Sequence, residues 1–142
     1  MQKYVLAFLF NTKLNQVLLL KKNRGPEHLI GKWTGLGGKV EAGETPLSAI
    51  KREVKEESGL QIEFNHSDHF ATLFKNGIFE MHIYTKSISN LDEFQELEDE
   101  ELGIAFVEFV DYSLLTKNGP WIINMALCKL RGCNDFLIIE ES

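Results

Sequence analysis

Long apolar runs near the start of the chain predict strands that are buried on both faces. Segments 4–11 (YVLAFLFN) and 16–23 (QVLLLKKN) are of this kind, and only the tetrapeptide TKLN separates them. Segments 61–75 and 78–88 also predict strands, the second because its apolar and polar residues alternate with the period of a half-buried strand. The Asn-Gly pair at 76–77 favours a hairpin turn between them.

Local boundary signals predict a helix over residues 46–58. Thr45 is a favoured N-cap, Pro46 suits the first helical position, and Gly59 accepts the left-handed conformation that often ends a helix. The preceding segment 24–40 is rich in glycine and contains a proline, which predicts a loop.

The last third of the chain carries loop, strand and helix signals in turn. The acidic run 92–101 predicts a loop, 102–110 a strand, 120–130 a helix that begins at a proline, and 135–141 a short final strand. We therefore expect an α/β fold in which a mixed sheet is sandwiched between helices, built as a single domain over residues 1–142.

Charge and hydropathy limit the kinds of partner that the protein can bind. The chain has 21 Asp and Glu against 15 Lys and Arg, a formal net charge of −6. An acidic surface of this kind argues against stable binding to nucleic acid or to anionic membranes. No apolar stretch approaches the roughly 18 residues of a membrane span, and the first apolar run suits a strand better than a signal peptide. We expect a cytoplasmic protein, either a monomer or a homodimer.

The two cysteines, Cys128 and Cys133, have no histidine or cysteine neighbours at the spacing of a zinc site. We expect them to be reduced residues that contribute to packing.

Five glutamates crowd the stretch 38–60. At 100° per residue, Glu53, Glu56 and Glu57 share an arc of about 100° beside the apolar stripe of the predicted helix. Like charges at these spacings destabilise a helix unless another charge compensates them.

Two interpretations fit these glutamates. They form either a solvated helix face, interleaved with the basic residues Lys51, Arg52 and Lys55, or a cup for a hard divalent cation such as magnesium. In the second interpretation, Gly37 and Gly38 let the backbone approach the ion without obstruction from side chains.

The identity of the residues decides between them. The segment fits every specified position of the signature G-x5-E-x7-R-E-U-x-E-E-x-G-U, where U is a bulky aliphatic residue, and so resembles the Nudix hydrolases. The segments VLLLKKNRG and GKWTGLGGKV and the predicted second helix resemble MutT-type members, especially the oxidised-purine nucleoside triphosphatases. The matching residues are Gly38, Glu44, Arg52, Glu53, Val54, Glu56, Glu57, Gly59 and Leu60.

The resemblance implies a division of labour within this box. Glu53, Glu56 and Glu57 would bind magnesium, with manganese as the alternative ion. Arg52 would pair with Glu44 to orient the loop, and the backbone of Gly37 or Gly38 would complete the metal shell.

The resemblance leaves the general base open between Glu53 and a carboxylate from a later loop. Glu98, Glu100 and Glu101 lie on such a loop, and Glu101 aligns best with an additional acid of the MutT-like enzymes. The alternative is that this run is a solvated acidic turn. Lys39, Lys22 and Arg24 are expected to contact phosphates; these three basic residues lie beside the glycines or in the preceding loop.

Two departures from the oxidised-purine enzymes affect the expected base pocket. Thr34 stands where those enzymes have an asparagine that contacts the base. The segment KNGPW stands where they have a tryptophan followed by a pair of aspartates. Asn118 and Trp121 are expected to supply an amide and a stacking face instead, although Trp121 is also a candidate core residue. The selectivity for oxidised purines is therefore open.

The function implied is the magnesium-dependent hydrolysis of a nucleoside diphosphate linked to another group, by attack of water at phosphorus. A nucleoside triphosphate cleaved to the monophosphate and pyrophosphate is favoured. The alternatives are another Nudix substrate, such as ADP-ribose, a dinucleoside polyphosphate or a sugar nucleotide, or a non-catalytic nucleotide-binding module.

Overall fold

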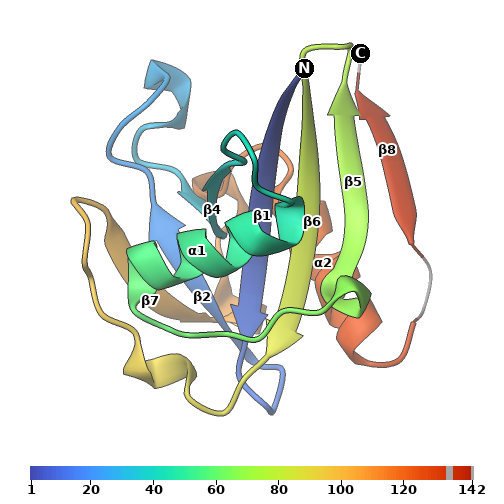
Figure 1. The fold of residues 1–142 in the computed structure, drawn as a ribbon. Helices are drawn as coiled ribbons and strands as arrows, with labels where there is room; N and C mark the ends of the chain where they lie inside the picture. Colours follow the sequence, from blue (N-terminus) through green and yellow to red (C-terminus); the bar gives the residue numbers. More distant parts are fainter. Residues whose placement is uncertain (134–135, 142) are drawn as a thin grey trace.

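In the computed structural model, which describes residues 1–133 and 136–141, eight strands form one mixed sheet with an α-helix on each face (Figure 1). Short 3-10 turns connect several of the strands. The strands are β1 (Gln2–Phe10), β2 (Gln16–Lys21), β3 (Trp33–Thr34), β4 (Leu36–Lys39), β5 (His69–Lys75), β6 (Phe79–Ser87), β7 (Glu101–Phe106) and β8 (Leu137–Glu141), and the helices are α1 (Pro46–Ser58) and α2 (Gly119–Leu130).

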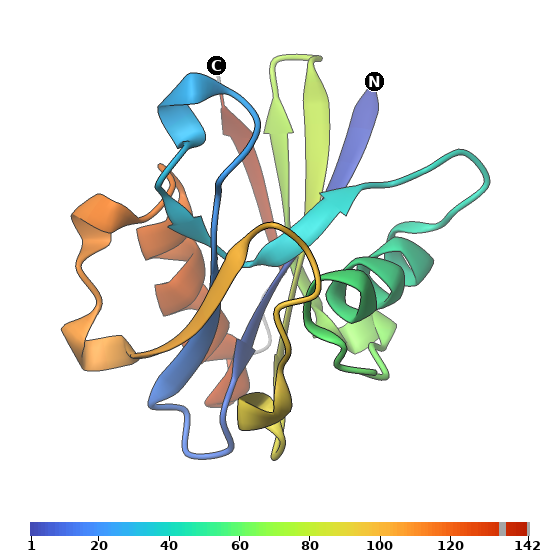
Figure 2. The same cartoon turned by 90° about the vertical axis from the view of Figure 1, so that its left-hand side faces the viewer.

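The strand order along the main path is β3-β2-β1-β6-β5-β8. Strand β1 branches, because its first half pairs with β4 and its second half with β2, while β7 pairs with β2. The β1–β6 and β5–β8 pairs are parallel and the others antiparallel. Figure 2 shows α1, in green, and α2, in red-orange, on opposite sides of this sheet. The predicted α/β sandwich is confirmed.

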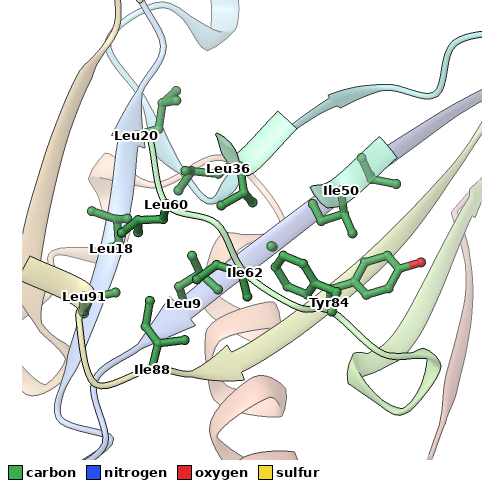
Figure 3. Close-up of a cluster of buried hydrophobic side chains, with 14 of the residues drawn as sticks. Leu9, Leu18, Leu20, Leu36, Ile50, Leu60, Ile62, Tyr84, Ile88 and Leu91 are labelled. Atoms are coloured by element: carbon green, nitrogen blue, oxygen red, sulfur yellow. The ribbon is translucent and has the colours of Figure 1, made fainter. Parts of the chain in front are cut away.

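Alternate residues of β1 enter two separate cores. Val5, Ala7 and Leu9 face α1, whereas the residues between them face α2. Figure 3 shows the first core, in which Leu9 and Ile50 lie among the buried side chains. Burial on both faces explains why the first strand is an apolar run rather than an alternating one.

Helix α1 has the predicted ends. Thr45 and Ser48 form a capping box, in which each side chain accepts a hydrogen bond from the other residue's backbone N–H. Gly59 ends the helix in the left-handed conformation with φ of 75°. Ile50 and Val54 are fully buried against the sheet, so the opposite flank of the helix is fixed in orientation.

The segment 24–40 contains two strands that its composition did not predict. β3 and β4 form because β1 and β2 offer free ladder positions, and β4 fits closely only because it is glycine-rich. A Cβ added at Gly37 would lie 2.0 Å from the carbonyl oxygen of Val5. Prediction of a loop from glycine content alone was therefore wrong over these residues.

Residues 61–65 are the converse case, since they were predicted to begin a strand but join no ladder. Their apolar residues alternate because Ile62 and Phe64 pack on the α1 core as an irregular strap. Likewise, the strand predicted over 102–110 ends at Phe106 and continues as a 3-10 turn, Val107–Phe109. Asp135, the first residue of the predicted final strand, lies outside the described residues.

The expectation of reduced cysteines was also wrong. Cys128 and Cys133 form a disulfide across the end of α2, with their Cα atoms 5.5 Å apart. The turn after α2 brings the two residues together, because the N–H of Cys133 bonds to the carbonyl of Cys128.

Within the described part of the chain, no helix is long and apolar enough to cross a membrane.

His69, at the start of β5, makes the stability depend on pH. Its ring stacks on Tyr84 with 4.9 Å between centroids and lies 5.0 Å from the ring of His82. Burial, reinforced by the charge of His82, lowers the pKa of His69 from 6.5 to about 4. Because this pKa is depressed on folding, the stability contributed above about pH 6.5 is lost as the pH falls toward 4.

Between about pH 7 and pH 5, the free energy of unfolding should fall by about 1 kcal/mol less in His69→Gln than in the parent protein. This value allows for the partial exposure of the ring. Urea denaturation at both pH values measures the loss. His28→Gln, at an exposed position, is the matched control. A loss as large in His69→Gln as in the parent protein would show that His69 titrates as an ordinary histidine.

Candidate active site

Strand β4 and helix α1 meet through two glycines. The N–H of Gly37 donates to Glu57 Oε1 at 2.8 Å. A Cβ on Gly38 would stand 2.5 Å from Glu53 Oε1, so the missing side chain leaves room for that carboxylate. The fold thus brings the glycine pair to two of the three predicted metal-binding glutamates.

The guanidinium of Arg52 joins the helix to the loop before it. Its Nε and Nη2 donate to the two carboxylate oxygens of Glu44 at 2.7 and 2.9 Å, and Nη2 also donates to the carbonyl of Lys39 at 3.0 Å. This fork–fork pair raises the pKa of Arg52 and lowers that of Glu44. The predicted pairing of Arg52 with Glu44 is present in the structure.

The third nitrogen of the same guanidinium reaches the other glutamates of the box. Nη1 of Arg52 lies 2.9 Å from Glu53 Oε1 and 3.2 Å from Glu56 Oε2. The side chain of Glu53 is only 15% exposed, whereas that of Glu56 is 52% exposed. Glu56 is therefore the box glutamate that solvent and ligands reach most freely.

The carboxylate of Glu57, which is buried, and that of Glu53, which is partly buried, form the electrostatic centre of the site. Burial raises the pKa of Glu53, and burial together with the charge of Glu53 raises the pKa of Glu57 to about 8. The carboxylate of Glu98 adds to the rise at both residues. A cation bound between these side chains would remove this repulsion, since an opposite charge favours the ionised form.

The acidic loop before β7 lies against this centre through Glu100. That residue's side chain is 8% exposed and its charge contributes to the raised pKa of Glu57. Asn23 holds the loop by donating its N–H to Glu100 Oε2 at 3.4 Å and its Nδ2 to the carbonyl of Asp99 at 2.9 Å. No local pattern marked Asn23, because its partners are more than 70 positions away.

Glu101, the favoured candidate of the acidic run, has the opposite orientation. It is exposed and pairs with Lys21 in the β2–β7 ladder, one position before Leu102. Leu102 is buried in the α1 core, so its neighbour points to the other face of the sheet. The role of Glu101 stays a prediction, and Glu98 and Glu100 are the residues of the acidic run whose charges act on the box glutamates.

The donor set fits a hard divalent cation. Within residues 1–133 and 136–141 no three such ligands are already assembled around one point, because Arg52 holds Glu53 and Glu56. The donors are nevertheless carboxylate oxygens beside a strand with no side chain at Gly38, which suits magnesium or manganese.

The three predicted phosphate contacts have different surroundings. Lys39 is exposed at the end of β4 and lies directly opposite Tyr4 in the ladder. Lys22 follows β2 and continues its pairing through Lys32. Arg24 already contacts the acidic loop, with Nη2 3.4 Å from Glu98 Oε2.

The predicted base contacts lie in β3 and at the start of α2. Thr34 sits in β3 opposite Leu20. Asn118 and Trp121 belong to the first turn of α2, on the other side of the sheet from α1, and the indole Nε1 of Trp121 donates to Asn118 Oδ1 at 2.9 Å. The ring of Trp121 is partly buried against the α2 core, so it serves packing as well.

This sheet between two helices, with a glutamate-rich helix on a glycine-rich strand, places the chain in the class of Nudix-fold proteins. The family model of the NUDIX domain matches residues 1–126. The chain belongs to this family and is a Nudix hydrolase.

Curated relatives support the same assignment. The chain is 40% identical over 131 residues to the oxidized purine nucleoside triphosphate hydrolase of Mus musculus. The aligned region covers 89% of this chain and 81% of that protein. A protein of the same name from Danio rerio is 40% identical over 72 residues, which span 45% of its length.

Solved structures confirm the fold. A NUDIX hydrolase from Nitrosomonas europaea superposes with a TM-score of 0.77 at 20% identity, covering 99% of this chain and 79% of that one. A MutT protein from Bacillus halodurans gives 0.67 at 21% identity, covering 100% and 91%. At such identities the likeness concerns the fold alone.

Proposed function

We propose that this Nudix hydrolase cleaves a nucleoside triphosphate, normal or oxidised, to the monophosphate and pyrophosphate, with magnesium bound at the glutamates of α1. The observation that carries the proposal is the repulsion between the partly buried Glu53 and the buried Glu57, which a cation beside the glycines of β4 would relieve. The names of the curated relatives support a nucleoside triphosphate as the substrate. Removal of damaged nucleotides from the precursor pool is the corresponding role.

When bound, the ion would polarise a phosphoryl oxygen and lower the pKa of a coordinated water. Glu53, Glu56 and Glu57 would hold it, together with a backbone oxygen of Gly37 or Gly38. Glu100 and Glu98 would close the site from the acidic loop.

The remaining residues of the site would orient and protect the reaction. Arg52 would keep the loop in place through Glu44, and Lys39 would bind a phosphate at the other side of β4. Glu53 or Glu100 would accept the proton from the attacking water, since both carboxylates lie against the buried centre.

A nucleotide panel tests the proposal. Normal and oxidised nucleoside triphosphates, ADP-ribose, dinucleoside polyphosphates and sugar nucleotides are incubated with the protein, with magnesium and with a chelator, and the products are separated by chromatography. We expect pyrophosphate and a monophosphate from at least one triphosphate, only when magnesium is present. A faster reaction with ADP-ribose or a dinucleoside polyphosphate would replace the proposed substrate, and nucleotide binding without turnover would indicate a binding module.

A further inference from the structure

Asn118 occupies the N-cap position of α2 but does not cap the helix. An N-cap asparagine normally accepts a hydrogen bond from a backbone N–H of the first turn. Here the side chain makes no such bond, and its Oδ1 accepts from the indole of Trp121 instead. The amide is therefore turned away from the helix end and held in a fixed position.

The other end of the same amide contacts Glu141, at the far end of β8. Asn118 Nδ2 lies 3.4 Å from Glu141 Oε2. The second oxygen, Glu141 Oε1, accepts from Lys117 Nζ at 2.5 Å and lies 3.6 Å from Lys75 Nζ. Hydrogen bonds from Lys117 and Asn118 lower the pKa of Glu141, so this carboxylate is ionised and acts as an acceptor only.

These contacts select one orientation of the Asn118 amide. A flipped amide would set Oδ1 against the carboxylate of Glu141 and Nδ2 against the N–H of Trp121, which would be two mismatches. In the observed orientation, Nδ2 uses one of its two N–H groups and Oδ1 uses one of its two lone pairs. One N–H donor and one acceptor lone pair are left to face a ligand.

Strand register places this amide on the same face of the sheet as Lys39. Glu141 pairs with Lys75, and Lys75 with Phe79. In the next row, partners continue from Ile139 through Leu73, Met81 and Tyr4 to Lys39. Directly paired residues share a face, so the row runs beneath one strip of the surface.

The strip is apolar between its two polar ends. Tyr4 and Phe79 are partly exposed and their rings meet edge to face with 5.7 Å between centroids. Four strand spacings of about 4.8 Å separate Ile139 from Lys39, or roughly 19 Å. A phosphate near Lys39 would thus leave the base over the aromatic residues, with its edge toward Asn118.

We infer that Glu141, with Lys117 and Lys75, positions the Asn118 amide so that it selects nucleotides whose base edge presents an acceptor beside a donor. The inference rests on the proposed function, because it assumes that the base lies on this strip. Glu141 acts through Asn118, and is a positioning residue rather than a contact to the base. An edge with two adjacent acceptors, such as N7 and O6 of unmodified guanine, would face the Asn118 oxygen unfavourably.

Glu141→Gln is the main test, since it keeps the size of the side chain but removes the charge that selects the amide orientation. We measure kcat/KM for the nucleotide panel, and the Kd of the corresponding nucleoside monophosphates by calorimetry without magnesium. The ratio between the best and the second-best base should fall by about 5-fold or more in both measurements. The kcat on the best substrate should stay within about twofold, since the α1 box is untouched.

The matched control is Glu140→Gln, the exposed neighbour on the opposite face of β8. It should leave both ratios unchanged. A double-mutant cycle with Asn118→Ala separates positioning from contact. In the Asn118→Ala background, Glu141→Gln should have no further effect on either ratio, whereas a persistent effect would overturn the positioning role.

The remaining outcomes are also decisive. Loss of stability in Glu141→Gln with unchanged ratios would show a structural role and overturn the inference. Monophosphates that bind without discrimination in the parent protein would overturn it as well. Discriminating binding of monophosphates together with a parent protein that cleaves no triphosphate would instead refute the proposed reaction and leave the positioning role supported.

Discussion

Replacement of Glu56 by glutamine is expected to reduce turnover by about 10²-fold or more, a loss of transition-state stabilisation of roughly 3 kcal/mol. The side chain of Glu56 is half exposed, and its one hydrogen bond within the described residues goes to Arg52. The substitution should therefore remove a proposed metal ligand without disturbing the fold. Steady-state hydrolysis of the preferred triphosphate at saturating magnesium measures the change.

The matched control for this variant is Glu63→Gln, which neutralises an exposed glutamate outside the box. It should retain the turnover of the parent protein. If Glu56→Gln were folded, as judged by circular dichroism, and nearly as active as Glu63→Gln, Glu56 would have no part in the chemistry.

Gly37→Ala should destabilise the protein by about 3 kcal/mol or more. The added Cβ would lie 2.0 Å from the carbonyl oxygen of Val5 and 2.9 Å from the Cα of Leu6, both in the backbone of the neighbouring strand. Backbone in the middle of a sheet moves little, so β4 would have to shift. That shift would disturb the hydrogen bond from the N–H of Gly37 to Glu57. Urea denaturation without metal measures the loss.

Gly38→Ala is the informative partner of that variant. The three atoms nearest to its Cβ would all belong to the carboxylate of Glu53, which ends a flexible side chain that can turn aside. We expect a smaller loss of stability, but a clearly smaller rise of Tm on addition of magnesium, because a displaced ligand weakens binding to the native state. A magnesium-induced rise equal to that of the parent protein would count against Glu53 as a ligand.

The predictability of the fold from sequence varied with the range of the interactions involved. Helix α1 could be bounded to the residue, because Thr45, Pro46 and Gly59 act within one turn of its ends. Strand β4 could not, because a glycine-rich segment becomes a strand only through its partner β1. Residues 61–65 carry a strand pattern, but they pair with none of the described strands.

The same distinction applies to the site. Glycines and glutamates of the box are close in sequence, and the structure places them together as the helical spacing predicted. The choice between Glu100 and Glu101 depends on which face of β7 meets α1, which one residue of register decides. Glu141 could not be found at all, since its partner Asn118 lies 23 positions away on another element.

Strand β4 separates the glutamates of α1 from the opposite surface of the sheet, because its successive residues face opposite sides. Gly38 opens toward the glutamates of α1, and its neighbour Lys39 sits over the opposite surface beside Tyr4. A shift of this strand by a single position would exchange the two sides, sending the lysine among the carboxylates and the glycine to the far surface. The near-contacts of Gly35 and Gly37 with the β1 backbone forbid that shift, because Leu36 would then have to fit where no side chain can. Insertions between residues 35 and 39 should thus abolish activity even when the protein still folds.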